Sequence, residues 1–387
     1  MNNINKSIAI LGSTGSVGQQ AVEIAKSLNL KVDLLTASSS VDIIEEQARA
    51  LKPKVCVLTN EKSALSLREK LKDTDIKVYG GEESAISSIK ASSADVAVNA
   101  VSGFAGLQPA IACAQSGKRI AMSNKEAIVI AYSFLKNEID KSNSELIPVD
   151  SEHSAIFQCL EGNKQNEIKR IILTSSGGPF RGKRIEELSN IKSKDALAHP
   201  TWKMGAKITV DSASLMNKGF EVIEAVRLFG VTPKQIKVVV HPQSIMHSAV
   251  EYSDNSVIAQ MGAPDMRTCI QYAITYPYRS RSLASELDFA SLSKLTFEDP
   301  DMDTFTLLPL AYYAIEEDGV IPAVLNAADE VAVKYFLADK IGFTDIFNVV
   351  ENVVTTFNKI KKPSLEDIFE ADRQARRKTE EYIKEFK

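Results

Sequence analysis

Apolar and polar residues alternate over the first 150 positions in a pattern that predicts repeated strand and helix pairs. Short apolar runs of strand length are each followed by a stretch with helical spacing. The runs cover residues 7–11, 32–36, 55–58, 77–79, 95–100 and 119–122. This alternation predicts a mostly parallel sheet with helices on both faces. Ligands of such sheets bind beyond the carboxyl ends of the strands, so the loops at that edge are the first place to look for a site.

The first predicted strand runs into a glycine-rich turn, Gly12-Ser13-Thr14-Gly15-Ser16-Val17-Gly18, which is followed by a helical pattern. Glycines allow a tight turn and let backbone N–H groups approach a pyrophosphate at the positive end of a helix. The spacing is GxxGxxG rather than the commoner GxGxxG, and a purely structural turn is the alternative. Its place after the first strand favours a dinucleotide site.

The second predicted strand ends at Ser38, Ser39 and Ser40. An NAD site would carry an acidic residue here to accept from the ribose 2′-hydroxyl. Three hydroxyl groups and no carboxylate favour NADP with its 2′-phosphate, although serines in loops often serve only as turn and cap residues.

Two more polar loops follow strands of the same predicted sheet. In the first, Ser123-Asn124-Lys125-Glu126, the lysine could orient a substrate or share in proton transfer. A helix cap with a first-turn acid is the structural alternative. In the second, Asp150-Ser151-Glu152-His153, the two carboxylates lie two residues apart and could share one cation, while Ser151 could cap the following helix.

The middle of the chain concentrates further candidates, since all four histidines and the single tryptophan lie between residues 153 and 247. Ser176 follows a predicted strand at 168–174 and precedes two glycines, which suits a phosphate cradle as well as an ordinary loop. Residues 192–206 contain Trp202 and Met204 among turn residues, which favours a lid over the site. The alternative is that these side chains anchor the loop to the core.

Asn217, Lys218 and Glu221 share one turn of a predicted amphipathic helix. An amide, an ammonium and a carboxylate together suit a ligand with a phosphate and a metal-chelating end, but a salt-bridged helix surface would look the same. His241 and His247 have no partner at zinc spacing, which favours structural or interface roles. Residues 249–252 and 257–261 predict an antiparallel hairpin, whose edge suggests a dimer.

The pattern predicts four regions. These are a Rossmann-like NADP-binding domain at 1–150, an α+β catalytic domain at 151–285, a linker at 286–306 and a helical domain at 307–387. In the last region, the acidic pair Asp329-Glu330 and the basic run 373–378 are interpreted as solvated helix faces.

Composition narrows the class of protein. The chain has 387 residues, which is long enough for two or three domains, and its net charge of −4 argues against an electrostatic nucleic-acid binder. Four scattered cysteines form no CxxC pair, so we expect neither a disulfide framework nor a zinc-thiolate site, and we expect a reduced, cytoplasmic setting. No apolar run approaches membrane-spanning length, and the N-terminus has no signal-peptide pattern.

Taken in order, these motifs resemble the 1-deoxy-D-xylulose 5-phosphate reductoisomerase family over essentially the whole chain. Beyond the loops described above, the resemblance includes Ser176 to Arg181, His199-Pro200, Asp211 to Glu221, His241 to Ser244, Gly262 to Arg267 and Leu325 to Ala328. It implies an enzyme that uses NADPH to isomerise and reduce 1-deoxy-D-xylulose 5-phosphate to 2-C-methyl-D-erythritol 4-phosphate, in isoprenoid precursor synthesis.

The resemblance also implies residue roles. The ligands of one Mg²⁺ or Mn²⁺ are then Asp150, Glu152 and Glu221, whose hard oxygens suit such a cation. The catalytic residues are Lys125, Glu152 and His199. The substrate-binding residues are Lys125, Ser151, Glu152, Ser176, His199, Ser212, Asn217, Lys218 and Glu221. The cofactor-binding residues are Thr14, Gly15, Ser16, Val17, Ser38, Ser39, Ser40, Asn124, Glu126 and Gly205.

Two other functions compete with this one. A semialdehyde dehydrogenase also begins with a GxxGxxG turn, but it needs a nucleophilic cysteine at a strand end, and Cys159 falls inside a predicted helix. A non-catalytic NADP-binding sensor would have lost the carboxylates or Lys125, and the chain retains them. We therefore expect a sugar-phosphate enzyme that is a homodimer and has neither a nucleic-acid nor a membrane partner.

Overall fold

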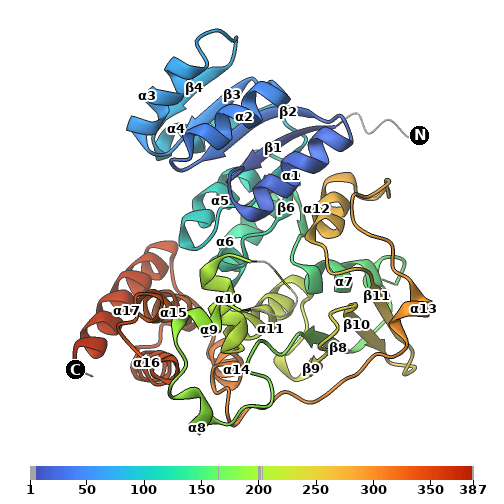
Figure 1. Cartoon of the computed structure of the whole chain (residues 1–387), viewed down its shortest axis with the longest axis vertical. Helices are drawn as coiled ribbons and strands as arrows, with labels where there is room; N and C mark the ends of the chain where they lie inside the picture. Colours follow the sequence, from blue (N-terminus) through green and yellow to red (C-terminus); the bar gives the residue numbers. More distant parts are fainter. Residues whose placement is uncertain (1–5, 164, 199–201, 203, 386–387) are drawn as a thin grey trace. The chain divides into compact units, whose positions relative to one another are not determined.

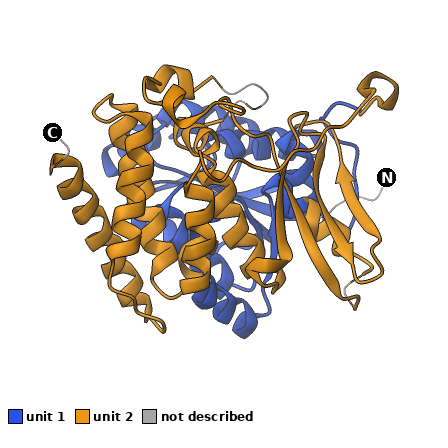
Figure 2. Ribbon diagram, turned by 90° about the horizontal axis from the view of Figure 1, so that it is seen from below, with its two compact units in different colours: residues 1–127, 132–154, 265–286 blue, residues 128–131, 155–264, 287–387 orange. Residues whose placement is uncertain are grey.

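The computed structural model describes residues 6–163, 165–198, 202 and 204–385. The chain forms two compact units. The first comprises residues 1–127, 132–154 and 265–286, and the second comprises residues 128–131, 155–264 and 287–387. Figure 2 colours the first unit blue and the second orange. Each unit has its own sheet.

The first unit is built on a seven-stranded sheet with the strand order β4-β3-β2-β1-β5-β6-β7 (Figure 1). All of its strand pairs are parallel. The strands are β1 (Ser7–Leu11), β2 (Lys31–Ala37), β3 (Val55–Leu58), β4 (Lys77–Gly80), β5 (Val96–Asn99), β6 (Arg119–Met122) and β7 (Glu145–Pro148). The chain order reverses between β1 and β5, and in sheets of this kind the crevice beyond such a reversal binds the ligand.

Helices connect these strands, as the alternating pattern predicts. They are α1 (Ser16–Ser27), α2 (Val41–Leu51), α3 (Glu61–Lys70), α4 (Glu82–Ala91), η1 (Phe104–Gly106), α5 (Leu107–Gln115) and α6 (Lys125–Ser142). α7 (Ser151–Leu160) follows the last strand, and its residues from 155 on belong to the second unit. α12 (Met266–Thr275) is a later segment of the first unit. Ala131 has non-helical angles and interrupts α6. The prediction of an N-terminal Rossmann-like sheet is confirmed.

The second unit contains a four-stranded sheet with the order β11-β10-β8-β9. The strands are β8 (Ile168–Ser175), β9 (Ile236–Val240), β10 (Met246–Tyr252) and β11 (Val257–Met261). β10 and β11 are antiparallel, which confirms the predicted hairpin, whereas β8 and β9 are parallel. The segment predicted as a linker contributes Glu298 to a bridge with Val240, so part of it is tied to this sheet.

Helices make up the rest of the second unit. They are α8 (Ile185–Leu188), α9 (Ser193–Ala196), α10 (Ala206–Ala213), α11 (Met216–Phe229), η2 (Pro233–Gln235), α13 (Phe289–Leu292), α14 (Leu307–Glu317), α15 (Ile321–Leu337), α16 (Phe343–Thr356) and α17 (Leu365–Glu385). One hydrophobic core includes residues of β8, α11, α14, α15 and α16. The C-terminal helices therefore pack on the central segment, and the predicted helical C-terminal region is confirmed.

The structure corrects one prediction in this region. The solvated face expected for Asp329-Glu330 is wrong for Asp329, which is 0% exposed on α15. Most residues of α15 are apolar, and a helix that is hydrophobic on most of its sides is buried. The run at 373–378 is more open, with Arg373 and Arg377 largely exposed. Among the described residues, no helix is both long enough and apolar enough to cross a membrane.

Candidate active site

The three glycines of the first turn serve different purposes. Gly12 has a φ of +76°, and a Cβ there would lie 2.7 Å from the Ala100 carbonyl oxygen. A Cβ on Gly18 would lie 2.1 Å from the Gly12 carbonyl oxygen. These two glycines are required by the fold itself. Gly15 is exposed, and a Cβ there would meet only the Gly12 oxygen at 3.5 Å. Gly15 is thus the position where a missing side chain leaves room for a ligand.

Hydrogen bonds to β2 and α2 fix the backbone of the glycine turn at Ser13. The Ser13 amide donates to the Thr36 carbonyl at 2.9 Å, and the Gln47 side-chain amide donates to the Ser13 carbonyl at 2.8 Å. Gly15 takes the N-cap position of α1, where no side chain accepts from the first turn. An anion could approach that helix end, because the first backbone N–H groups of a helix have no partner within it.

The serine loop lies at the same edge of the sheet. Ser38 and Ser39 are exposed directly after β2, and Ser40 takes the N-cap position of α2 without a side-chain capping bond. The Ser38 carbonyl accepts from the Asn60 amide at 3.0 Å, which ties the loop to the end of β3. The hydroxyls of Ser38 and Ser39 therefore lie at the surface beyond the strand, as a 2′-phosphate site needs. Their contact with the cofactor stays a prediction.

Asn124 has a clear structural role. Its Oδ1 accepts from the Ala127 amide at 2.8 Å and caps α6. Its Nδ2 lies 2.8 Å from the Val101 carbonyl, 2.9 Å from the Gly103 carbonyl and 2.9 Å from Glu126 Oε2. The helix-cap alternative is confirmed for Asn124, which also fixes the loop after β5. The cofactor contacts of Asn124 and Glu126 stay predictions.

Lys125 and Asp150 form a largely buried ion pair. Lys125 Nζ lies 2.8 Å from Asp150 Oδ2, and the two side chains are 10% and 19% exposed. The elements that present them are the first turn of α6 and the end of β7. Parallel strands β6 and β7 bring these two loops together, because their carboxyl ends meet at one edge of the sheet.

Asp150 also caps α7 from the position just before it, a role that the sequence pattern assigns to Ser151. The Asp150 carbonyl accepts from the Ser154 amide at 2.8 Å, and its carboxylate accepts from the Ser151 amide at 3.0 Å. The predicted capping role of Ser151 is therefore wrong. Its hydroxyl instead donates to Glu152 Oε2 at 2.5 Å. A carboxylate at a helix N-terminus is stabilised in its charged form.

Asp150 and Glu152 have the proximity that a shared cation needs. A carboxylate oxygen of Asp150 and one of Glu152 lie within 4.8 Å of each other. His153 is fully buried behind them, with Nδ1 3.9 Å from Asp150 Oδ2. Burial first, and then the charges of Asp150, Glu152 and Asp265, raise the pKa of the Cys269 thiol to about 12 despite a hydrogen bond with Ser154. Three carboxylates therefore lie near this thiol, and two of them are paired with the cations Lys125 and Arg267.

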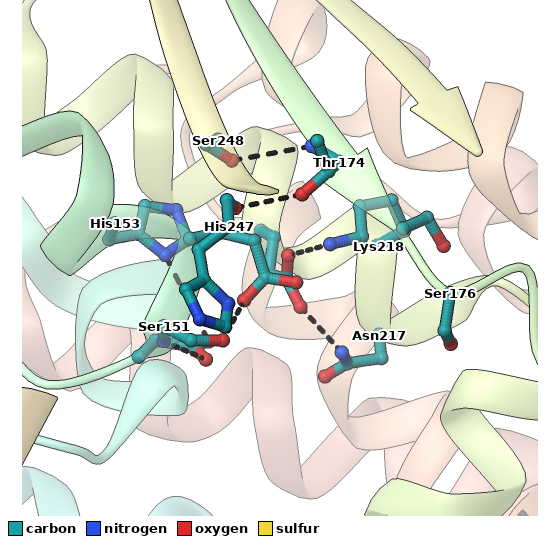
Figure 3. A network of polar contacts seen from close by, with 12 residues as sticks. Ser151, His153, Thr174, Ser176, Asn217, Lys218, His247 and Ser248 are labelled. Carbon is teal, nitrogen blue, oxygen red and sulfur yellow. Dashed lines mark hydrogen bonds and ion pairs between the residues drawn. The ribbon is translucent and has the colours of Figure 1, made fainter. Parts of the chain in front are cut away.

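The second unit carries its own group of functional side chains on α11. Asn217 Nδ2 donates to Glu221 Oε1 at 2.5 Å, and the Lys218 ammonium forms an ion pair with the other Glu221 oxygen (Figure 3). Lys218 is 3% exposed and Glu221 is 1% exposed. The alternative of a salt-bridged helix surface is wrong, because the charged groups are buried. Buried charges of this kind are costly and are typical of functional sites.

A glycine loop lies against the end of α10 in the same unit. Ser176 follows β8, and Gly177 and Gly178 have φ angles of +83° and +67°. A Cβ on Gly178 would lie 2.6 Å from the Ser212 carbonyl oxygen, so this contact requires glycine. The loop that carries Ser176 and the helix that carries Ser212 are therefore in direct contact, which suits a shared ligand for their hydroxyls.

The strands beside this loop are fixed by Thr174. Its hydroxyl donates to the His247 carbonyl at 2.8 Å, and its amide donates to Ser248 Oγ at 3.3 Å (Figure 3). These bonds join β8 to β10 just before Ser176. The position of Ser176 thus depends on the sheet and not on the loop alone.

The predicted lid is described only in part. Trp202 is half-buried, with its ring centroid 6.4 Å from that of His247. This contact fits the alternative in which the loop is anchored to the core. Gly205 is exposed at the N-cap of α10. His199, a predicted catalytic and substrate-binding residue, lies outside the described residues.

His241 has a structural role, as its spacing predicts. Its Nδ1 lies 2.9 Å from the Thr296 carbonyl, and its Nε2 accepts from the Ile245 and Met246 amides at 3.2 Å each. The ring also stacks on Phe297 with centroids 4.8 Å apart. Both ring nitrogens are therefore used in holding the turn after β9, which leaves none for a metal.

All four cysteines are free and buried. Burial raises the pKa of the Cys159 thiol to about 11, although it accepts hydrogen bonds from the Gln260 and Val250 amides. Cys159 lies within α7 and not at a strand end. A thiol that is buried and protonated at neutral pH is a poor nucleophile, so the structure argues against a semialdehyde dehydrogenase.

Lys207 forms a charged group with two buried carboxylates that no sequence motif indicates. Lys207 Nζ lies 2.7 Å from Asp211 Oδ2 and 2.7 Å from Asp329 Oδ2. Asp329 stands among alanines and valines in the sequence, and that apolar setting is the signal that marks it as buried.

The Rossmann-like sheet and the polar side chains at the carboxyl ends of its strands define a dinucleotide-dependent oxidoreductase. Three family models identify it further: 1-deoxy-D-xylulose 5-phosphate reductoisomerase at residues 8–132, the 1-deoxy-D-xylulose 5-phosphate reductoisomerase C-terminal domain at 146–229, and the DXP reductoisomerase C-terminal domain at 261–378. The chain belongs to the 1-deoxy-D-xylulose 5-phosphate reductoisomerase family.

Individual relatives agree over nearly the full length. The 1-deoxy-D-xylulose 5-phosphate reductoisomerase of Ruminiclostridium cellulolyticum is 50% identical, over 96% of this chain and 97% of the relative. That of Phocaeicola vulgatus is 47% identical, over 97% of this chain and 98% of the relative. The resemblance drawn from the sequence motifs is thereby confirmed, and with it the prediction of an oxidoreductase.

Solved structures agree with the fold. The reductoisomerase from Zymomonas mobilis in complex with NADPH has a TM-score of 0.91 and 37% identity, over 98% of this chain and 99% of that one. A DOX-P reductoisomerase in complex with NADPH, fosmidomycin and magnesium also has a TM-score of 0.91 and 37% identity, over 98% of both chains. These matches confirm the predicted fold class.

Proposed function

We propose that this protein converts 1-deoxy-D-xylulose 5-phosphate into 2-C-methyl-D-erythritol 4-phosphate, a step of isoprenoid precursor synthesis that uses NADPH and a divalent metal ion. Family membership over nearly the whole chain supports the reaction. Relatives of the same fold have been solved with NADPH and with magnesium. The observation that carries the proposal in this chain is the Lys125–Asp150–Glu152 group at the carboxyl edge of the sheet.

The first turn fits NADPH. Gly15 is exposed and has no close neighbour, so the backbone there can approach a pyrophosphate, while Gly12 and Gly18 shape the turn behind it. Thr14, Ser16 and Val17 complete the contact surface that we propose. Bound NADPH supplies a hydride to the substrate carbon.

We assign the rest of the cofactor site to loops along the same edge. Ser38, Ser39 and Ser40 would bind the 2′-phosphate through hydroxyl groups, which agrees with their exposure after β2. Asn124, Glu126 and Gly205 complete the proposed set. The loop of Ser38, Ser39 and Ser40 carries no acidic residue. It would therefore not repel the 2′-phosphate, whereas the carboxylate of an NAD site would.

Asp150, Glu152 and Glu221 are the metal ligands in this proposal. The chemistry of the donors fits Mg²⁺ or Mn²⁺, since all three offer carboxylate oxygens. Asp150 and Glu152 already have oxygens within 4.8 Å of each other. Glu221 is held by Asn217 and Lys218, which fix its carboxylate in one orientation. The bound ion supplies a Lewis acid that stabilises negative charge developing on substrate oxygens.

The substrate phosphate would bind to groups of the second unit. Lys218 supplies a positive charge, Asn217 an amide, and Ser176 and Ser212 two hydroxyls from the loop and helix that touch at Gly178. His199, which lies outside the described residues, completes the proposed substrate-binding set. Such a set matches a phosphate, which accepts several hydrogen bonds and needs a compensating charge.

Lys125 would act on the reacting end of the substrate. Its ammonium is held by Asp150 and its side chain is 10% exposed, so the ammonium can donate a proton or a hydrogen bond at a fixed place. The Ser151 hydroxyl donates to Glu152 Oε2. This bond orients the Glu152 carboxylate, whose other oxygen would then bind the metal ion. We propose that Ser151 and Glu152 contact the substrate from this position.

Two further features belong to the proposal. We infer a homodimer in which β11 pairs across a two-fold axis, because its Val257 and Ile258 side chains are 51% and 39% exposed at the sheet edge. We also infer a cytoplasmic setting, which agrees with four free cysteines.

The product identifies the reaction most directly. The protein is incubated with 1-deoxy-D-xylulose 5-phosphate, NADPH and Mg²⁺, and the phosphorylated product is identified by NMR spectroscopy. We expect 2-C-methyl-D-erythritol 4-phosphate in amounts equal to the NADPH consumed. Consumption of NADPH with a different product, or no product at all, would overturn the proposal.

A further inference from the structure

Lys207 lies between two buried carboxylates that belong to distant parts of the sequence. Its Nζ is 2.7 Å from Asp211 Oδ2 and 2.7 Å from Asp329 Oδ2. Asp211 is 2% exposed and Asp329 is 0% exposed. The ammonium also lies 4.8 Å from the centroid of the Phe220 ring. Buried charges tolerate little displacement, since each would lose its partner in a medium of low dielectric constant.

This group joins α10 to the C-terminal helices. Lys207 and Asp211 are one turn apart on α10, whereas Asp329 lies in the middle of α15. Burial raises the pKa of Asp329 even though Lys207 opposes the change, which is the behaviour of a carboxyl group deep in the protein. α10 is thus attached to α15 through a carboxylate that is shielded from water, although the Lys207 side chain itself is 30% exposed.

α10 carries two residues of the proposed site at its two ends. Gly205, a proposed cofactor contact, is its N-cap, and Ser212, a proposed substrate contact, follows Asp211 directly. α11 begins at Met216, and its first turn holds Asn217 and Lys218. A rotation or shift of α10 would therefore move cofactor and substrate groups together.

The neighbour of Asp329 on α15 has a different role. Glu330 Oε2 lies 2.6 Å from Arg376 Nη2, and Arg376 Nε lies 2.8 Å from Asp372 Oδ2. Arg376 and Asp372 are both on α17. Glu330 therefore joins two C-terminal helices to each other, which makes it a matched control for Asp329.

We propose that Asp329 is a positioning residue of the active site. It acts through Lys207 and Asp211, and it holds α10 in the orientation in which Gly205 and Ser212 face their ligands. The C-terminal helices then contribute to substrate binding without contacting the substrate. The effect on substrate binding rests on the proposed function, whereas the anchoring of α10 does not.

The anchoring is tested on the ligand-free protein. Trp202 is the single tryptophan and lies just before α10, so its fluorescence reports on this segment. Acrylamide quenching is measured for the unmodified protein, Asp329→Asn, Lys207→Met and the control Glu330→Gln. We expect the quenching constant to rise about twofold in Asp329→Asn and in Lys207→Met, because α10 and Trp202 would separate from the core more often once the contact with α15 is lost. In Glu330→Gln the constant should stay unchanged.

The consequence for the site is tested by steady-state kinetics. We expect Asp329→Asn and Lys207→Met to raise the KM for 1-deoxy-D-xylulose 5-phosphate about tenfold with a smaller change in kcat, since displaced binding groups weaken the complex. Asp329→Glu, which keeps the charge, should recover part of the loss. Glu330→Gln should have the kinetics of the unmodified protein.

Each outcome decides the proposal. Unchanged quenching and unchanged KM in Asp329→Asn would overturn the proposal. Equal effects in Glu330→Gln would also overturn it, because they would show a general loss of helix packing. If Asp329→Asn does not fold, Lys207→Met on the half-exposed side of the contact decides alone. If the unmodified protein does not turn over the substrate, the proposed function fails, and the quenching result still decides whether Asp329 anchors α10.

Discussion

Lys125 Nζ lies 2.8 Å from Asp150 Oδ2, and the pair stands at the carboxyl edge of the nucleotide-binding sheet. An ammonium in this position neutralises a carboxylate that we propose as a metal ligand. It would also lie beside any substrate bound to that metal ion. Metal binding by Asp150 and the action of Lys125 on the substrate can be tested separately. Binding of a cation needs Asp150 to be charged, but it does not need Lys125.

The first prediction concerns Lys125→Met. We expect kcat to fall by about 10² to 10⁴, the usual range for loss of a positioned proton donor. Binding of Mn²⁺, followed by electron paramagnetic resonance, should stay equal or become tighter, because the repulsion between the ammonium and the cation is removed. Weaker Mn²⁺ binding would show that Lys125 supports the metal site rather than the chemistry.

The second prediction concerns Asp150→Asn. Loss of one charged oxygen ligand should lower metal-dependent NADPH oxidation at least about a thousandfold. The affinity for NADPH, measured by fluorescence titration, should remain nearly that of the unmodified protein, because Asp150 is not among the residues assigned to the cofactor. Full activity in this variant would refute the metal assignment.

The third prediction separates a glycine of the fold from a glycine of the site. In Gly15→Ala the new Cβ meets nothing closer than 3.5 Å, so the free energy of unfolding should change by less than about 1 kcal/mol. NADPH affinity should still fall about tenfold, because the Cβ occupies space that the pyrophosphate needs.

Gly18→Ala is the contrasting variant. Its Cβ would lie 2.1 Å from the Gly12 carbonyl oxygen, so the helix must move and the protein should lose about 1–3 kcal/mol of stability. Urea denaturation of both variants measures this difference. Equal destabilisation in Gly15→Ala would mean that Gly15 is also a structural glycine.

The fourth prediction follows from the buried thiols. Burial raises the pKa of Cys56, Cys113 and Cys269 from 9.0 to about 12, so each thiol ionises more readily in the unfolded chain. The stability that comes from burying these thiols in their neutral form is therefore complete below about pH 9, and it is lost as the pH rises toward 12. The melting temperature of Cys113→Ala should fall less steeply between pH 9 and pH 11 than that of the unmodified protein. Parallel curves would contradict the shift.

Cys159 gives a separate test of the alternative enzyme class. We expect Cys159→Ala to keep its activity within about threefold, because the thiol is buried and takes no part in the reaction. A semialdehyde dehydrogenase would lose its nucleophile and with it all activity.

The features that depend on residues close together in the chain can be predicted from the sequence. The apolar runs and the glycine turn predict the parallel sheet correctly, since both depend on residues adjacent in the chain. The shared turn of Asn217, Lys218 and Glu221 is likewise a property of helix geometry alone. The structure adds that Lys218 and Glu221 are buried, which their polar composition does not indicate.

Two predictions are wrong, for different physical reasons. Asp329 was assigned to a solvated face because charge usually marks a surface, but Lys207, 122 positions away, provides the partner that permits burial. Serine is a favoured cap, which points to Ser151, yet Asp150 accepts from the Ser151 and Ser154 amides and caps α7 itself. The burial of Asp329 depends on a tertiary contact, which a local pattern does not contain, whereas the cap of α7 depends on which of two adjacent favoured residues the helix uses.

The central claim is that this protein reduces 1-deoxy-D-xylulose 5-phosphate with NADPH at a metal site formed by carboxylates. It is tested most directly by the absorbance of NADPH in the presence of this substrate, with Mg²⁺ and then with excess EDTA. We predict a steady loss of absorbance that EDTA stops and that added Mg²⁺ or Mn²⁺ restores. A loss that continues unchanged in EDTA, or no loss in the presence of Mg²⁺, would contradict the claim.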